Sequence, residues 1–92
     1  MVKVGNYNYE LSTKKDKKLM TVVNGKTIHF GQAGYQHYFD QTELLPFSQN
    51  HFDPNRRDRY RARAKMIKDK DKKLTVDDPE SANYHAYRIL WR

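Results

Sequence analysis

The clearest alternation of apolar and polar positions lies in residues 18–31, KLMTVVNGKTIHFG. Asn24-Gly25 is the preferred dipeptide of a two-residue type I′ turn, because both turn positions need a positive φ. Counting outward from this turn pairs Val23 with Lys26 and predicts a β-hairpin over residues 18–31. Since a lone hairpin is marginally stable in water, its more apolar face must pack on other elements. That face carries Leu19, Thr21, Val23, Ile28 and Phe30.

A different, helical period begins after Asp53-Pro54. Asp is a favoured helix cap, and Pro fits the first helical turn because it has no N–H to leave unpaired. The sequence therefore predicts a basic helix over residues 54–68. Its apolar positions fall at i, i+4 and i+7 and form one narrow packing stripe: Tyr60, Ala64 and Ile67.

Asp78-Pro79 repeats this start signal and predicts a C-terminal helix over residues 79–91. This helix has apolar side chains on two sides, which is typical of a helix held between other elements. The aromatic side either completes the core or forms a docking surface. Its aliphatic side carries Ala82, Ala86, Ile89 and Leu90, and its aromatic side carries Tyr84, Tyr87 and Trp91.

The remaining segments have weaker patterns. Residues 1–17 alternate at first and then become rich in Lys, so they are expected to form a short strand or an extended arm. Residues 32–40 have aromatic residues at helical spacing and predict a short helix. Residues 41–52 contain Pro46 and are too apolar for a free linker, so we expect an irregular segment that packs on the core or contacts another chain. Residues 69–78 alternate in charge and predict a surface loop.

Together these elements predict a small α+β fold, with residues 1–92 as a single domain. An N-terminal β-hairpin packs against two longer helices and one short helix. The hydrophobic content is only 37%, but aromatic residues make up 13% and can bury large areas. The absence of cysteine excludes disulfides and thiolate metal sites. No apolar run approaches a membrane span and no signal peptide is evident, so a soluble protein is expected.

Charge changes this picture most strongly in the basic helix. The formal net charge is +7, and basic residues dominate residues 54–73. One interpretation is a solvated amphipathic helix. The other is a phosphate-binding helix, since Arg matches phosphate bidentately and an anionic partner would relieve the repulsion between like charges. We expect Arg57, Arg61 and Lys65 to project away from the packing stripe. The candidate nucleic-acid contacts are Arg56, Arg57, Arg59, Arg61, Arg63, Lys65 and Lys68, with a second patch at Lys14, Lys15, Lys17 and Lys18.

The chain contains no catalytic motif, and no cofactor is expected. A metal site remains as a minor alternative. His-x2-Asp and His-x-Asp spacings could supply nitrogen and oxygen ligands, but Asp53 is already explained as a helix cap. The residues in question are His37, Asp40, His51 and Asp53.

Several of these motifs occur together in an order that resembles a known family. They are Lys17-Lys18 before the hairpin, Gly25-Lys26-Thr27-Ile28-His29-Phe30-Gly31 with Gly34-Tyr35, Arg57 to Arg63 around Tyr60, and the terminal Leu90-Trp91. The chain resembles, over residues 14–91, a family of small basic proteins of unknown function from bacteriophages and large DNA viruses. It departs from the family at Arg63-Ala64, where Arg-His is common, and at residues 41–52, which look like an insertion. The resemblance implies a viral origin and supplies no activity.

The function expected from the residues is non-catalytic binding of nucleic acid, with phosphate contact dominating over base readout. An alternative is a virion structural protein, either capsid cement or a head-associated subunit, that contacts acidic capsid protein or packaged genome. A third and weaker alternative is an inhibitor of a host enzyme. The expected location is the host cytoplasm or the virion, without a membrane partner.

Overall fold

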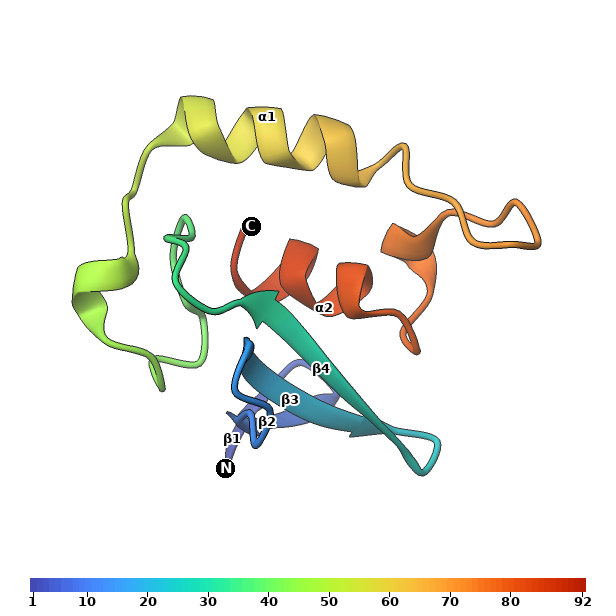
Figure 1. The fold of residues 1–92 in the computed structure, drawn as a ribbon, viewed down its shortest axis with the longest axis horizontal. Helices are drawn as coiled ribbons and strands as arrows, with labels where there is room; N and C mark the ends of the chain where they lie inside the picture. Colours follow the sequence, from blue (N-terminus) through green and yellow to red (C-terminus); the bar gives the residue numbers. More distant parts are fainter.

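Four antiparallel strands form one sheet in a computed structural model that describes residues 1–92. The strands are β1 (Val2–Val4), β2 (Tyr7–Leu11), β3 (Lys17–Val23) and β4 (Lys26–Gln32), and they lie in the sheet in chain order. Two α-helices follow, α1 (Pro54–Ala64) and α2 (Ala82–Ile89). Figure 1 shows α2 lying between the sheet and α1. The chain is therefore a small α+β domain, as its patterns predict.

The β3–β4 hairpin has the register that its turn predicts. Val23 pairs with Lys26 and Leu19 pairs with Phe30. Asn24 and Gly25 have φ values of 51° and 77°, as a type I′ turn requires. The face expected to be buried is buried at all five of its positions, Leu19, Thr21, Val23, Ile28 and Phe30.

Of the two alternatives for residues 1–17, the strand holds and the extended arm does not, with residues 12–16 connecting β2 to β3. β1 and β2 make a second hairpin, and β2 pairs with β3 so that Tyr9 lies opposite Thr21. Tyr9 is only 2% exposed, because its ring packs edge-on against Phe30 beneath α2. The burial of this one large side chain explains why the segment docks instead of extending into solvent.

Both helices are shorter than their sequence patterns predict. α1 ends at Ala64 because the chain then tightens, with the N–H of Ile67 donating to the Ala64 carbonyl, and Ile67 remains half exposed. α2 begins at Ala82, since Asp78 accepts from the Ser81 N–H in a turn. Ser81 then caps the helix by accepting from the N–H of Asn83. Neither helix is long and apolar enough to cross a membrane.

The core lies between the sheet and α2. Tyr9, Leu19 and Phe30 of the sheet pack against α2, with partly buried Trp91 at the edge. Ala86 and Ile89 of α2 and the adjoining Leu90 belong to this cluster, whereas Ala82 is exposed. The aliphatic side of α2 therefore packs on the sheet as expected. The aromatic side, expected either to complete the core or to form a docking surface, is partly covered, because Tyr84, Tyr87 and Trp91 are all half-buried.

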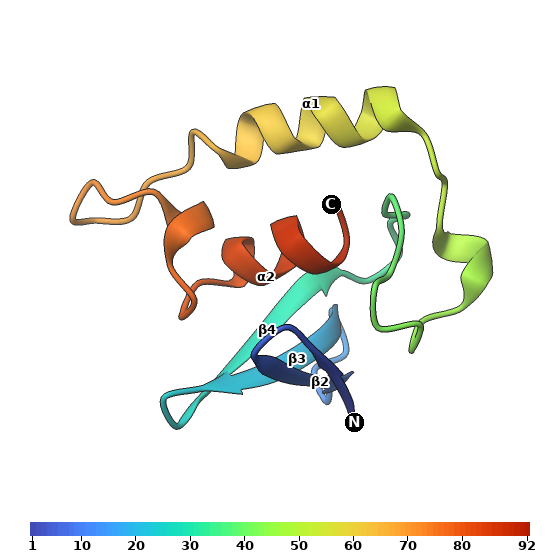
Figure 2. The same cartoon turned by 180° about the vertical axis from the view of Figure 1, so that it is seen from behind.

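The short helix expected in residues 32–40 does not form. Its backbone instead serves the C-terminal end of α2, where the N–H groups of Tyr38 and Phe39 both donate to the Leu90 carbonyl at 3.1 Å. The adjacent Gln41 N–H donates to the Ile89 carbonyl at 3.0 Å. These bonds satisfy the free carbonyls of a helix end and hold the segment in an extended path. Two 3-10 turns lie elsewhere, at Phe47–Gln49 and Thr75–Asp77. Figure 2 shows, from behind, how residues 33–53 wrap around this end of the molecule.

Candidate functional site

Helix α1 starts where its sequence predicts and sets the position of every Arg it carries. The Asp53 side chain accepts from the N–H of Asn55 at 2.9 Å and from that of Arg56 at 3.4 Å, with Pro54 in the first turn. Tyr60 then stacks on Trp91 with ring centroids 4.2 Å apart and planes within 9°. Ala64, near the end of the helix, is buried. These contacts fix the rotation of α1 about its axis.

One row of Arg side chains on α1 packs inward. The Arg57 guanidinium lies over the Tyr38 ring at 4.8 Å and pairs with Asp58 at 3.1 Å. Arg61 lies over the Tyr87 ring at 4.0 Å and donates to the Trp91 carbonyl at 3.1 Å. The prediction that Arg57 and Arg61 project away from the packing stripe is therefore wrong. An Arg can stack flat on an aromatic ring, which a pattern of apolar positions does not reveal.

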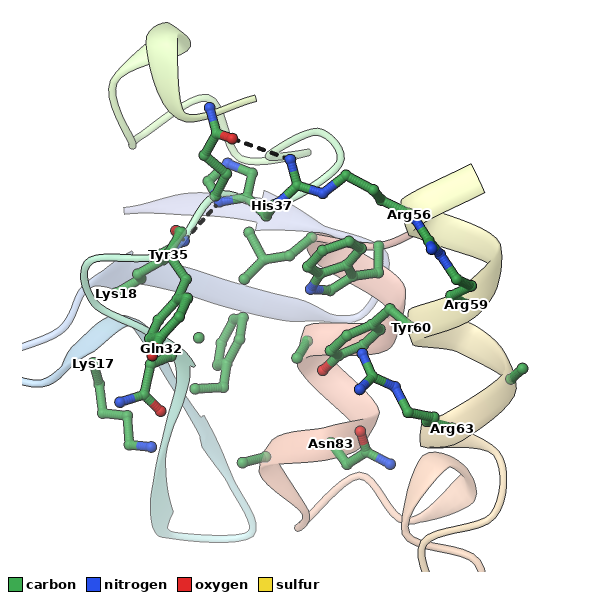
Figure 3. Close-up of a pocket in the computed structure, with 18 residues that line it drawn as sticks. Lys17, Lys18, Gln32, Tyr35, His37, Arg56, Arg59, Tyr60, Arg63 and Asn83 are labelled. Atoms are coloured by element: carbon green, nitrogen blue, oxygen red, sulfur yellow. Dashed lines mark hydrogen bonds between the residues drawn. The ribbon is translucent and has the colours of Figure 1, made fainter. Parts of the chain in front are cut away.

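The other row, Arg56, Arg59 and Arg63, borders a cleft of about 1070 Å³. The opposite wall is formed by the start of β3 and the end of β4, and α2 forms the floor. Figure 3 shows Arg59 and Arg63 on one wall, with Lys17, Gln32 and Tyr35 on the other. At one end, Arg56 donates to Gln36 at 3.1 Å and links the two walls. We call this hollow the basic cleft.

The lining of the basic cleft contains cationic side chains and no carboxylate. None of Arg56, Arg59 and Arg63 forms an ion pair. A cleft with one sign of charge focuses the electrostatic field and attracts a ligand of the opposite sign. The arrangement can therefore bind an anion with several charges. The basic residues of the lining are Lys17, Lys18, Arg56, Arg59 and Arg63.

Lys18 differs from the other cations because it is buried and its ammonium is held by two neighbouring groups. Its ammonium donates to the Tyr35 carbonyl and lies 3.0 Å from Nδ1 of His37. His37 Nε2 in turn lies 2.7 Å from Oδ1 of Asn50, which also accepts from the Asp40 N–H. Asn50 Oδ1 must therefore be the acceptor, so His37 carries its proton on Nε2 and accepts from Lys18 on Nδ1. This network ties residues 35–50 to β3.

Burial governs the charge states within this network. It lowers the pKa of Lys18, partly opposed by the negative charge of Asp40. Burial also lowers the pKa of His37, and the neighbouring Lys18 ammonium lowers it further. A neutral His37 is what the network requires, because only the neutral ring can accept from Lys18. The main role of Lys18 is therefore to hold the wall of the basic cleft in place, because its ammonium is bound within the fold.

The predicted contact residues separate into two groups. The basic cleft brings together Arg56, Arg59 and Arg63 with Lys17 and Lys18. It does not include the other six. Arg57 and Arg61 pack inward, Lys65 lines a separate small hollow, and Lys68 bridges to Leu74 beyond the helix. Lys14 and Lys15 are exposed in the β2–β3 connection.

The residues weighed as metal ligands have other partners. Asp40 accepts from the Thr42 N–H and hydroxyl and from the Leu45 N–H, which orders the turn after it. His51 Nδ1 accepts from the Asp53 N–H, and Asp53 caps α1. No group of three or more acidic, His or Cys residues is placed to hold a metal ion. His29 is half-buried, and its Nδ1 lies 2.7 Å from the Ser12 hydroxyl.

Several lining residues were not predicted from the sequence. Gln32 and Tyr35 follow the hairpin, and Asn83 lies in the first turn of α2. Trp91 was predicted only as part of a core or docking face. Each belongs to a segment that reaches the cleft through tertiary packing, so neither spacing nor charge marks it. The one available signal was the Gly31–Gly34 interval, whose two glycines have φ values of 79° and 89° and turn the chain there.

Comparison with known proteins adds a partial family match. The model of a family of unknown function (DUF5754) matches residues 8–43, less than half of the chain. The matched part runs from β2 through β4 to Glu43 and contains one wall of the basic cleft, whereas α1 and α2 lie outside it. No curated protein and no solved structure matches the chain.

Proposed function

We propose that this protein binds nucleic acid without catalysis, through phosphate contacts in the basic cleft. The observation that carries the proposal is the row of Arg56, Arg59 and Arg63, three guanidinium groups without an ion-pair partner along a cleft that has no carboxylate. Arg binds phosphate oxygens bidentately. Phosphate neutralisation also supplies most of the free energy of non-specific nucleic-acid binding.

The geometry supports phosphate contact better than an isolated basic helix would. Arg56, Arg59 and Arg63 recur at i, i+3 and i+7, so they lie on one side of α1. Lys17 lies across the cleft and supplies a cation from the opposite wall. A phosphate backbone that enters the cleft would therefore meet positive charge on two sides.

The test is the salt dependence of binding, measured by fluorescence anisotropy with labelled oligonucleotides. Contacts from Arg56, Arg59, Arg63 and Lys17 predict that log K falls against log salt with a slope of roughly −3 to −4. Binding should be measurable at low salt and weak for any particular sequence, since phosphates carry no sequence information. No binding to any oligonucleotide at low salt would overturn the proposal.

We also keep a viral origin, with a place in the host cytoplasm or the virion, as part of the proposal. One observation favours the virion alternative, in which the protein is a structural subunit of the particle. Phe47 is 73% exposed and Phe52 46% exposed, and their rings lie 5.6 Å apart near the start of α1. Exposed aromatic groups of this kind are common in protein interfaces. Copurification of the protein with particles at high salt would favour the structural role, whereas its loss from particles would favour nucleic-acid binding alone.

A further inference from the structure

The basic cleft offers more than positive charge. Tyr35 reaches it from the segment after β4, and its side chain is 69% exposed, so the ring has a free face. The backbone of Tyr35 is nevertheless fixed, because its carbonyl accepts from the buried Lys18 ammonium. An exposed aromatic ring on a fixed backbone is the kind of platform on which nucleobases stack.

The floor of the cleft adds a hydrogen-bond acceptor without a partner. Asn83 Nδ2 donates to the Ala64 carbonyl and to the Thr75 hydroxyl, both at 3.0 Å, so both of its N–H groups are used. These bonds fix the amide orientation and leave Oδ1 free. Figure 3 shows this oxygen turned toward Tyr60 and Arg63. Every nucleobase has an N–H donor on its pairing edge, so such an acceptor would serve any unpaired base.

The dimensions of the site fit a short stretch of one strand. Arg63 lies seven positions after Arg56, so the row extends roughly 10 Å along the helix. A stacked strand advances about 3.4 Å per nucleotide, so the row matches about three phosphates. The cleft volume of about 1070 Å³ lies just above the usual range for small-molecule sites.

From these observations we infer that the basic cleft holds unpaired nucleotides of a single strand, with phosphates along the Arg row and a base stacked on Tyr35. This inference rests on the proposed function and narrows it. A duplex keeps its bases stacked inside and presents mainly phosphates, so the Tyr35 ring and the Asn83 oxygen would have no free base to contact. A single strand presents phosphates and unpaired bases at the same time.

The first test compares three labelled ligands of equal length at one salt concentration. They are oligo-dT, a duplex, and an oligomer with the same phosphates and abasic sugars. We expect oligo-dT to bind at least tenfold more tightly than either of the others. Oligo-dT should also change the emission of Trp91, the only tryptophan in the chain and a lining residue of the cleft. Comparing oligo-U with oligo-dU identifies the preferred sugar, because these two ligands differ only in the 2′-hydroxyl, and tight binding of any single strand supports the inference.

The second test uses a pair of exposed aromatic residues. Tyr35→Ala should weaken oligo-dT about fivefold or more and leave the abasic oligomer unchanged, since only the stacking contact is lost. Phe47→Ala removes a similarly exposed ring outside the cleft and should bind like the parent. Thermal melting should show both variants folded.

The outcomes distinguish the single-strand inference from the phosphate-binding function on which it rests. Equal, salt-dependent affinity for all three ligands would overturn the single-strand inference and keep the phosphate-binding function. Preference for the duplex, or an equal effect of Tyr35→Ala and Phe47→Ala, would also overturn the inference. Absence of binding to every ligand at low salt would overturn both.

Discussion

His85 is completely buried between the sheet and α2, and its partners determine its chemical form. Its Nε2 lies 2.6 Å from the Pro79 carbonyl, which can only accept, so Nε2 carries the proton. Its Nδ1 must then accept from the Tyr9 hydroxyl at 2.9 Å. This pair joins β2 to α2 through the core. His37 is held in the same neutral form by Lys18 and Asn50.

The Tyr9–His85 contact makes a stability prediction. Tyr9→Phe keeps the ring and its packing but leaves His85 Nδ1 buried without a donor. The free energy of unfolding should fall by about 1–3 kcal/mol, the usual cost of an unsatisfied buried group. Tyr35→Phe removes a hydroxyl from an exposed residue and should change stability little. Urea titration of both variants measures the difference, and equal stability would contradict the assigned hydrogen bond.

Both histidines also predict a dependence of stability on pH. Burial lowers the pKa of His85 and of His37 in the folded protein, and Lys18 lowers that of His37 further. In the unfolded chain they titrate near the ordinary value of about 6.5. Below that pH the unfolded state binds more protons than the folded state, so the free energy of unfolding decreases as the pH falls. It should be fully retained above about pH 6.5 and should decline toward the lowered pKa values.

Melting at pH 7.5 and at pH 5.5 tests this dependence, with NMR signals of the imidazole rings to assign it. The folded His37 and His85 rings should remain neutral after the histidines of the urea-unfolded chain have become protonated. A melting temperature that is unchanged or higher at pH 5.5 would show that His37 and His85 do not govern stability at acidic pH.

At the scale of single elements, α1 is amphipathic in an unusual way. Its apolar stripe is reduced to Tyr60 and Ala64, and two flanking Arg side chains extend the packed face through aromatic contacts. The remaining three Arg side chains face the cleft. One helix thus uses the same residue type both to pack on aromatic rings and to line the basic cleft.

Replacing individual Arg side chains should separate these two uses. Arg61→Gln removes the stacking on Tyr87 and the bond to the Trp91 carbonyl, so we expect it to destabilise the fold by about 1–2 kcal/mol. Arg59→Gln should leave stability within about 0.5 kcal/mol, since the side chain is exposed and unpaired. Thermal melting of the two single variants provides the comparison. Greater destabilisation by Arg59→Gln would reverse the assignment of the two rows.

Gly25, which precedes β4, and Gly31, which lies within β4, offer a second comparison. Gly25 and Gly31 both have positive φ, near 77° and 79°, so alanine is strained at either position. At Gly25 an added Cβ meets nothing within 4 Å, whereas at Gly31 it would lie 3.0 Å from a side-chain carbon of Leu90. Gly25→Ala should cost about 1–2 kcal/mol, and Gly31→Ala should cost more because it also pushes β4 away from α2. Equal melting temperatures would mean that β4 and Leu90 are not in close contact.

For the whole molecule, the sequence predicts the fold better than it predicts the site. The hairpin register follows from Asn24-Gly25, and the start of α1 follows from Asp53-Pro54, because both signals act over a few residues. The paths of residues 33–53 do not follow from local pattern. They depend on the Leu90 and Ile89 carbonyls, which lie far away in sequence. These carbonyls accept hydrogen bonds from N–H groups of residues 38–41 that would otherwise bond within a short helix.

The same limit applies to the basic cleft. Composition correctly indicates a cationic helix, but the rotation of α1 is fixed by the Tyr60–Trp91 stack, which joins distant parts of the chain. Without knowledge of that contact, the sequence does not show that Arg57 packs inward and Arg59 faces the cleft. Tyr35 and Asn83 reach the cleft from segments that have no charge signal, so only the three-dimensional structure brings them to the Arg row.

The most direct test of the central claim compares two charge-matched triple variants in the salt titration. Replacing Arg56, Arg59 and Arg63 with Gln should flatten the slope of log K against log salt from the parent value of roughly −3 to −4 to about −1, and it should weaken binding to all oligonucleotides. Replacing Lys3, Lys26 and Lys70 with Gln removes the same charge from exposed positions outside the cleft. This second variant should keep the slope of the parent protein. An equal loss in both variants would show that net charge, and not the basic cleft, binds the nucleic acid. An unchanged slope in the Arg variant, with the fold intact, would place the contact elsewhere.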